Sequence, residues 1–394
     1  MLTIVRVETF LMRAGGPTET AWSASGLSGA GTRHWCFVRI TAEDGTRGIG
    51  EGSGWPRLVH AACEELAPLL VGEDATGIER LWQKMHLAQM GHGMTGTPGG
   101  GALSALETAL WDLNARALGV PLWRLLGGKL RDVVPAYAHT SGVETARRLI
   151  GLGYRTFKTG GVATAQDKAA ALRAEFGSDI DLCVDLHGPP WLTPGDARRA
   201  LRRMEDLDLL FAEEPVAPEL APAMADLRRE GVPLAAGERV AKLWDGARLV
   251  TEGYVDVVQP DTGRFGGLSQ MRKLAAVAEA HGVTVAPHAG TLGPVAEFAA
   301  LHLMATLPNA LILERFGEDW PGRAKVVTAS PELRDGGLVV PDAPGLGVDL
   351  VDEEIARHAP GPGIRVPAHS DHCAPGTANE FPYIQARRAA GAPR

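Results

Sequence analysis

Short apolar segments that end in a titratable residue recur through the second part of the chain. Three of them end in carboxylates: Asp185, the pair Glu213 and Glu214, and Glu238, whose first acids are 28 and 25 residues apart. If these segments are adjacent parallel strands, the carboxylates converge and repel one another unless a cation lies between them. All-oxygen ligation suits Mg²⁺ better than Zn²⁺, which prefers nitrogen and sulfur. The pattern therefore predicts a magnesium site, the alternative being that each acid pairs with an arginine or caps a helix.

Two further segments end in Asp261 and His288, which are 27 residues apart. A carboxylate beside an imidazole fixes its tautomer and raises its basicity, so this pair predicts a general base. Lys158, His187 and Glu314 also lie at or just after the ends of such segments. One charged strand end means little, because loops are normally polar, but a succession of them indicates a single functional rim.

A scaffold that brings strand ends together is predicted by the pattern that begins at residue 131, where short apolar strands alternate with amphipathic helices. We expect eight strands, at Val133–His139, Thr156–Thr159, Asp181–Leu186, Leu209–Glu214, Pro233–Glu238, Val255–Asp261, Val283–His288 and Leu311–Arg315. Helical patterns between them include Ala163–Phe176, Ala197–Met204 and Leu268–His281. This alternation favours a closed parallel barrel with its chemistry at the carboxyl ends of the strands. No G-x-G-x-x-G motif follows the first strand, which weakens a dinucleotide-binding interpretation.

The first 130 residues follow a different pattern, which indicates a separate α+β domain. Antiparallel strands are predicted at Leu2–Phe10 and Trp35–Thr41. Helices are predicted at His60–Leu70, at Ile78–Met90 and from Leu103 to Leu118, before Pro121. Two glycine-rich segments, Gly15–Gly31 and Gly91–Gly101, are expected to form flexible loops.

Composition excludes several classes of protein. The 394 residues are 45% hydrophobic and 22% charged, which is ordinary for a globular chain and argues against fibrous or disordered classes. The formal net charge of -8 argues against a general nucleic-acid binder. No apolar run is long enough to span a membrane or to form a signal peptide. The four cysteines lack a disulfide-framework spacing, so a reduced, cytoplasmic protein is expected.

Several longer motifs carry a family resemblance. They are ALETALWDLNARALGVPLWRLLGG (102–128), CVDLHG (183–188), FAEEP (211–215), AAGERV (235–240), VVQPDTGRFGGLSQ (257–270) and VAPHAGTLGP (285–294). With these motifs the chain resembles the enolase superfamily, in its mandelate racemase-like branch, and within it the galactonate dehydratase-like acid-sugar dehydratases. The resemblance implies a (β/α)7β-type TIM barrel with an α+β capping domain. Residues 1–130 would form the cap, 131–345 the barrel, and 346–394 a segment that returns to the cap and ends in a loop-rich tail.

The resemblance also implies roles for individual residues. Asp185, Glu213 and Glu238 would bind Mg²⁺, with Glu213 preferred over Glu214 because the first acid of that motif is the ligand in the family. His288, oriented by Asp261, would be the base and His187 the acid. Lys158 would assist at the substrate carboxylate, and Glu314 would help to hold the substrate or the enediolate. The loops over the barrel mouth make Trp22, His34, Trp55 and His92 candidates for contact with the substrate, although each also fits ordinary packing of the cap.

The implied reaction is Mg²⁺-dependent dehydration of a C5 or C6 sugar acid to a 2-keto-3-deoxy acid, through a metal-stabilised enediolate. Racemases and epimerases of this branch carry Lys-x-Lys at the second strand, whereas this chain has Lys158-Thr159-Gly160, which counts against racemisation and for elimination. An epimerase or racemase, or a cycloisomerase, of the same superfamily remains an alternative, as does a non-catalytic sugar-acid binding regulator. The expected partners are a small sugar acid and further copies of the chain, with no nucleic acid and no membrane.

Overall fold

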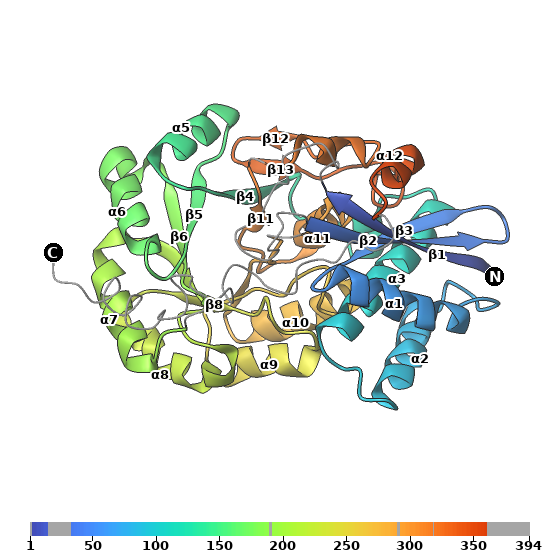
Figure 1. The fold of residues 1–394 in the computed structure, drawn as a ribbon, viewed down its shortest axis with the longest axis horizontal. Helices are drawn as coiled ribbons and strands as arrows, with labels where there is room; N and C mark the ends of the chain where they lie inside the picture. Colours follow the sequence, from blue (N-terminus) through green and yellow to red (C-terminus); the bar gives the residue numbers. More distant parts are fainter. Residues whose placement is uncertain (1, 15–32, 189–190, 290–291, 318, 361–394) are drawn as a thin grey trace.

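The molecule divides into two parts that lie side by side. The computed structural model describes residues 2–14, 33–188, 191–289, 292–317 and 319–360. Figure 1 shows a small sheet with helices at one end and a ring of strands surrounded by helices at the other. The expected loop Gly15–Gly31, the candidate Trp22 and the expected tail beyond residue 360 fall outside the described residues.

The smaller part is a three-stranded antiparallel sheet covered by helices. The strands are β1 (Ile4–Ala14), β2 (Arg33–Ala42) and β3 (Arg47–Gly52), in the order β1-β2-β3. The helices are α1 (Pro56–Leu66), α2 (Ile78–Met90), α3 (Thr97–Ala117) and α4 (Leu122–Leu125). Glycine at alternate positions of β3 lets α3 pack directly on the strand: a Cβ added at Gly50 would stand 1.9 Å from the Ala105 carbonyl oxygen.

Helix α3 begins earlier than the sequence pattern indicates. A helix from Leu103 was expected and is present, but the expectation of a loop across Gly91–Gly101 is wrong from Thr97 onward. Glycine is a poor helix former, which hides this start from propensity arguments. Packing explains the exception, since a Cβ added at Gly100 would stand 2.2 Å from the Arg264 carbonyl oxygen. The glycines thus allow the helix to approach the barrel backbone.

The larger part is a closed barrel of eight parallel strands, as predicted. The strands are β4 (Val133–His139), β5 (Thr156–Gly160), β6 (Asp181–Asp185), β7 (Leu209–Glu213), β8 (Leu234–Ala236), β9 (Val257–Val258), β10 (Thr284–Val285) and β11 (Leu313–Arg315). Each pairs in parallel with the next from β4 to β10, and β11 pairs with β4. A bridge between Val285 and Ala310 closes the remaining gap. Strands β8 to β10 are shorter than the sequence pattern indicated.

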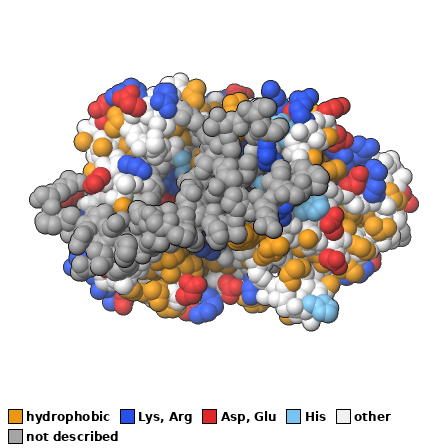
Figure 2. Space-filling model, viewed as in Figure 1, with side chains coloured by type: hydrophobic (Ala, Val, Ile, Leu, Met, Phe, Trp, Pro, Cys, Tyr) orange, Lys and Arg blue, Asp and Glu red, His pale blue; other side chains and the backbone are white. Residues whose placement is uncertain are grey.

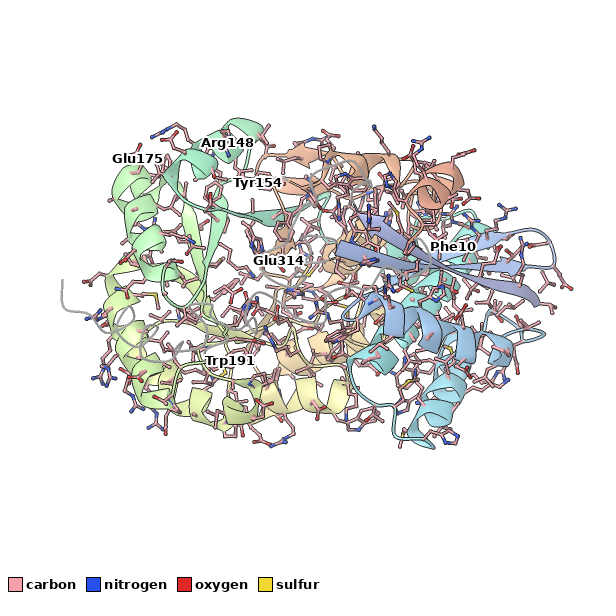
Figure 3. All side chains as sticks on the ribbon, in the orientation of Figure 1. Phe10, Arg148, Tyr154, Glu175, Trp191 and Glu314 are labelled. Carbon is pink, nitrogen blue, oxygen red and sulfur yellow. The ribbon has the colours of Figure 1, made fainter. Side chains whose placement is uncertain are left out.

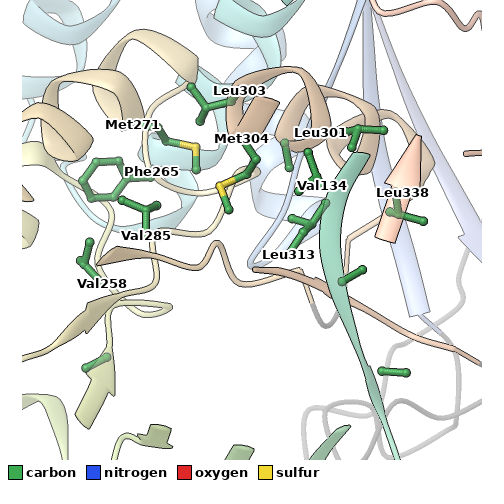
Figure 4. Close-up of a cluster of buried hydrophobic side chains, with 14 of the residues drawn as sticks. Val134, Val258, Phe265, Met271, Val285, Leu301, Leu303, Met304, Leu313 and Leu338 are labelled. Carbon is green, nitrogen blue, oxygen red and sulfur yellow. The ribbon is translucent and has the colours of Figure 1, made fainter. Parts of the chain in front are cut away.

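Among the described residues, seven α-helices connect the strands and cover the barrel. They are α5 (Val143–Leu152), α6 (Ala165–Phe176), α7 (Pro194–Met204), α8 (Met224–Leu227), α9 (Leu243–Thr251), α10 (Leu268–Ala280) and α11 (Pro294–Thr306). The main hydrophobic core lies between this layer and the strands; Figure 4 shows Leu301 and Met304 of α11 close to Val134 and Leu313 of the sheet. The architecture is therefore a (β/α)7β barrel with a capping domain, and the predicted fold class is confirmed.

The chain returns to the cap after the barrel. The hairpin of β12 (Leu333–Arg334) and β13 (Gly337–Val339) pairs with β4, and α12 (Asp352–Arg357) packs against β1. Arg39 of the cap forms a 2.5 Å ion pair with Asp352. On the face drawn in Figure 2, acidic and basic side chains are interspersed. In the described ranges no helix is long and apolar enough to cross a membrane.

His302 of α11 is expected to make stability depend on pH. It has no exposed surface; its Nδ1 accepts a hydrogen bond from the Trp123 backbone N–H (3.2 Å) and its Nε2 donates to the Leu346 carbonyl (3.1 Å). Burial lowers the pKa of His302 to about 4. The unfolded chain therefore binds one more proton between about pH 6.5 and pH 4, so that stability falls on acidification through this window, by on the order of 3 kcal/mol.

The measurement is urea unfolding of wild type and His302→Gln at pH 7 and at pH 4.5. Because glutamine does not titrate, the variant should lose less stability than wild type between the two pH values. Equal losses would show that His302 is not the group responsible.

Candidate active site

Polar side chains end the parallel strands, and the strand register brings them to one mouth of the barrel. Asp185 at the end of β6 is paired with Glu213 at the end of β7. Asp261, after β9, is bridged to His288, after β10. Figure 3 shows Glu314, from β11, in the middle of the ring of strands. The residues predicted to form one rim are thus neighbours in space.

Lys158, the middle residue of β5, is a buried ammonium surrounded by carboxylates. Its Nζ lies 2.8 Å from Glu213 Oε2, 2.7 Å from Glu314 Oε1 and 3.6 Å from Asp185 Oδ2. Burial alone lowers the pKa of Lys158, but the negative charges of Glu213 and Glu314 outweigh it and hold the pKa well above its usual value. The surrounding carboxylates therefore favour the positively charged form of Lys158.

His288 is buried between two carboxylates. Its Nδ1 lies 2.6 Å from Asp261 Oδ2, and its Nε2 lies 2.7 Å from Glu238 Oε2. Burial lowers the pKa of His288, but the charges of Glu238 and Glu314 raise it well above the ordinary value. Asp261 holds Nδ1 as the protonated nitrogen, so Nε2 is the nitrogen that can exchange a proton at the mouth.

His187 forms a second imidazole–carboxylate pair, two residues beyond β6. Its Nδ1 lies 2.5 Å from Asp185 Oδ1, and 38% of its side chain is exposed. Burial lowers the pKa of His187, but the adjacent Asp185 charge raises it to about 9. A protonated imidazole at the open side of the mouth is suited to donate a proton.

The buried acidic side chains of the site outnumber the lysine and arginine side chains that pair with them. The buried carboxyl groups are those of Asp185, Glu213, Glu214, Glu238, Asp261 and Glu314. The lysine and arginine side chains paired with them are Lys158, Arg239 and Arg264. Such an excess is costly in a buried site and favours binding of a further cation.

A divalent metal fits this donor set. Glu213 Oε2 accepts hydrogen bonds from Lys158 Nζ and from Gln259 Nε2, whereas Glu213 Oε1 is buried with no hydrogen-bond partner in the described part of the chain. A buried carboxylate oxygen without a donor is an available ligand. Among the described residues, no three His, Cys, Asp or Glu side chains already form a metal-binding group. The acids instead contact Lys158, Arg239 and His288.

The two consecutive acids after β7 have different surroundings. Glu213 lies at the end of β7, next to Asp185 and Lys158, and burial raises its pKa to about 7. Glu214 has a left-handed backbone, with φ of 42°, and its carboxylate pairs with Arg239. Burial and the charge of Glu238 raise the pKa of Glu214 to about 8. The turn at Glu214 therefore separates the two side chains.

The residues predicted to line the substrate pocket lie in different settings. His34 lies in β2 opposite Arg13, with 8% of its surface exposed. Trp55 precedes α1 and is 65% exposed, and His92 is an exposed residue after α2. Contact between these residues and a substrate stays a prediction.

His139, at the end of β4, is a site residue that the sequence predictions omitted. Its Nε2 lies 2.5 Å from Glu314 Oε1, and its ring stacks on Phe316 with centroids 4.5 Å apart. His139 is the last residue of a strand that was predicted with the correct ends. The rule that singled out the other strand ends would have found it.

Arg239 and Trp191 complete one wall of the mouth. Arg239 pairs with both Glu214 and Glu238. Its guanidinium lies 4.9 Å from the centre of the Trp191 ring, which is 6.2 Å from the His187 ring. Figure 3 places Trp191 on the segment between β6 and α7. Arg239 follows a predicted ligand directly, whereas no sequence signal marks Trp191.

Two protein families together cover most of the chain. Residues 6–127 match the family "Mandelate racemase / muconate lactonizing enzyme, N-terminal domain", and residues 142–355 match the family "Enolase C-terminal domain-like". The chain is also 35% identical, over 343 residues, to the D-galactonate dehydratase of Verminephrobacter eiseniae (strain EF01-2). That alignment covers 80% of this chain and 88% of the relative.

Solved structures of similar fold include enzymes with different reactions. The 3,6-anhydro-D-galactonate cycloisomerase from Zobellia galactanivorans superposes with a TM-score of 0.80 at 28% identity, over 91% of this chain and 100% of that one. An enolase from Pantoea ananatis, with bound D-gluconate and magnesium, gives a TM-score of 0.80 at 26% identity. It covers 91% of this chain and 95% of its own.

Proposed function

Since the chain belongs to the enolase superfamily, in the branch of mandelate racemase and muconate lactonizing enzyme, we propose that it removes water from a sugar acid. The substrate would be an aldonate such as galactonate or a related C5 or C6 acid, and the product a 2-keto-3-deoxy acid. The similarity to a D-galactonate dehydratase supports this choice of reaction. The gluconate and magnesium of the Pantoea ananatis structure support an acid sugar and Mg²⁺ as the ligands.

The observation that carries the proposal is a pair of imidazoles with different surroundings on one rim. His288 is buried against Asp261, and His187 is partly exposed beside Asp185. Elimination of water needs a base that removes a proton from one carbon and an acid that protonates the hydroxyl on the next. Two histidines with separate carboxylate partners can divide these roles when one is protonated and the other is neutral. The charges of Glu238 and Glu314 raise the pKa of His288, and a cation bound by Glu238 would oppose this effect and favour the neutral imidazole that a base requires.

In the proposed reaction His288 removes the C2 proton with Nε2, while Asp261 holds the Nδ1–H and stabilises the imidazolium that forms. Lys158 offers its ammonium to the substrate carboxylate, where negative charge develops as the C2–H bond breaks. His187 gives a proton to the 3-hydroxyl group, so that the C3–O bond breaks and water leaves. The resulting enol then tautomerises to the 2-keto-3-deoxy acid.

Asp185, Glu213 and Glu238 would hold Mg²⁺. When bound, the ion would act as a Lewis acid that neutralises the charge of the substrate carboxylate, and this makes the adjacent C–H bond more acidic. The partnerless Glu213 Oε1 and the surplus of buried carboxylates support this assignment.

Substitution of His187 by asparagine tests dehydration against proton exchange alone. Loss of the acid should reduce product formation by about 10²- to 10⁴-fold. The variant should still exchange the C2 proton of the substrate in D₂O, because His288 and Lys158 are intact. The measurement combines NMR of deuterium incorporation at C2 with an assay for 2-keto acid.

Other outcomes of this experiment identify other reactions. Wild-type exchange or inversion at C2 without loss of water would favour an epimerase. Opening or closure of a ring in the substrate, without gain or loss of water, would favour a cycloisomerase. This is the activity named for the Zobellia galactanivorans structure. Full product formation by the variant would exclude His187 as the acid.

A further inference from the structure

A serine of the capping domain contacts the carboxylate that orients the proposed base. Ser53 follows β3, and only 4% of its surface is exposed. Its Oγ donates a hydrogen bond to Asp261 Oδ1 at 3.0 Å, and its backbone N–H donates to the Gly263 carbonyl at 2.7 Å. The cap is thus bonded directly to the loop that follows barrel strand β9.

Both oxygens of Asp261 have partners in this arrangement. Oδ1 accepts from Ser53 Oγ and from the Gly263 backbone N–H at 2.8 Å. Oδ2 lies 2.6 Å from His288 Nδ1 and 3.3 Å from Arg264 Nε. Rotation of the carboxylate group would break bonds at both oxygens. The bond from Ser53 to Oδ1 therefore helps to fix the direction in which Oδ2 meets the imidazole.

The Arg264 side chain also contacts both Ser53 and Asp261. Its Nε also lies within hydrogen-bond distance of Ser53 Oγ, at 3.3 Å, and its Nη1 donates to the backbone carbonyl of Glu238 at 3.1 Å. One guanidinium therefore contacts the cap serine, the Asp261 carboxylate and the segment after β8 that carries Glu238.

Close backbone packing leaves this junction little room to move. A Cβ added at Gly101 would stand 2.7 Å from the Ser53 carbonyl oxygen, and one added at Gly263 would stand 2.8 Å from Ser53 Oγ. Glycines on both sides of the contact let the cap helix α3 and the barrel loop approach the serine. Because this junction is close-packed, a shift of the cap at Ser53 would also shift the barrel loop that it contacts.

We propose that Ser53 is a positioning residue for the His288–Asp261 pair, so that docking of the capping domain orients the base of the barrel domain. This inference rests on the proposed function for the identity of the base. It adds that the cap contributes to proton abstraction through Asp261. A displaced imidazole would slow proton removal without changing the groups that bind the substrate carboxylate.

Ser104 of α3 provides a matched control. It is a fully buried cap serine whose Oγ accepts a hydrogen bond from the Gly266 backbone N–H at 2.9 Å, in the same barrel loop. Ser104→Ala therefore removes one hydrogen bond between the same two domains without removing a donor to Asp261. Both alanine variants are expected to lower the melting temperature to a similar degree.

The test compares Ser53→Ala, Ser53→Thr and Ser104→Ala in the full-length Mg²⁺-loaded protein. We expect Ser53→Ala to slow C2 proton exchange by about 10- to 100-fold through kcat, with KM within about 3-fold of wild type. Ser104→Ala should stay within about 3-fold of wild type in both constants. Ser53→Thr keeps the hydroxyl and should recover part of the lost rate. Equal effects of the two alanine substitutions on kcat would overturn the proposal.

A second readout needs no substrate. The low-field ¹H NMR signal of the His288 Nδ1–H, assigned by its absence in His288→Asn, reports the hydrogen bond to Asp261. It should shift or broaden in Ser53→Ala and stay unchanged in Ser104→Ala; an unchanged signal in both variants would refute the role of Ser53. If the wild type acts on no sugar acid, the proposed function fails, and this spectrum still decides the positioning role.

Discussion

Replacement of His288 by asparagine is expected to abolish turnover, with a loss of at least about 10³-fold in kcat. Asparagine can still donate a hydrogen bond to Asp261, which lies 2.6 Å from His288 Nδ1, but it cannot accept a proton at the position of Nε2. The C2 proton beside a carboxylate is a very weak acid, so no other side chain should replace the base. The loss should appear both in product formation and in exchange of the C2 proton in D₂O.

The same variant should keep its fold and its metal. His288 is not among the proposed ligands, so we expect Mg²⁺ affinity, measured by calorimetry, to stay within a few-fold of wild type. Retained exchange in His288→Asn would remove the assignment of the base. Loss of both exchange and Mg²⁺ binding would indicate a collapsed site rather than a missing base.

Replacement of Glu213 by glutamine is expected to produce the second large effect. The substitution removes one negative charge where Glu213 Oε1 has no hydrogen-bond partner in the described residues. It also removes the anionic partner of Lys158 at 2.8 Å. Mg²⁺ affinity should fall by at least roughly 10- to 100-fold, the loss typical even for groups outside the ligand sphere, and turnover should fall with it.

The neighbouring acid is the matched control for this substitution. Glu214 has the same chemistry and is buried, but its carboxylate pairs with Arg239. Glu214→Gln should therefore leave Mg²⁺ affinity within a few-fold of wild type. If Glu214→Gln loses the metal and Glu213→Gln retains it, the ligand assignment at this strand is wrong.

Much of the barrel and its rim could be predicted because both depend on local pattern. Short apolar segments alternating with amphipathic helices indicated the eight strands, and a parallel register then places successive strand ends together. The contacts of Lys158 with Glu213 and of His288 with Asp261 follow from that register. The pairing of Asp185 with His187 is a short-range contact within one loop.

The remaining features depend on contacts between distant segments, which leave no periodic signal. The early start of α3 at Thr97 relies on glycines such as Gly100, which packs against the backbone of Arg264. Ser53 reaches Asp261 from another domain, 208 residues away in sequence. Glu213 and Glu214 are consecutive residues of the same type, so the sequence alone does not distinguish them. The left-handed backbone at Glu214, which separates their side chains, is seen only in the fold.

The most direct test of the proposed function is an assay of the purified protein against a panel of C5 and C6 aldonates, galactonate included, for formation of 2-keto-3-deoxy acid. We predict that at least one acid is dehydrated in the presence of Mg²⁺, that EDTA stops the reaction and that added Mg²⁺ restores it. Absence of product from every acid with folded, Mg²⁺-loaded protein, or product formation that EDTA does not affect, would contradict the proposal.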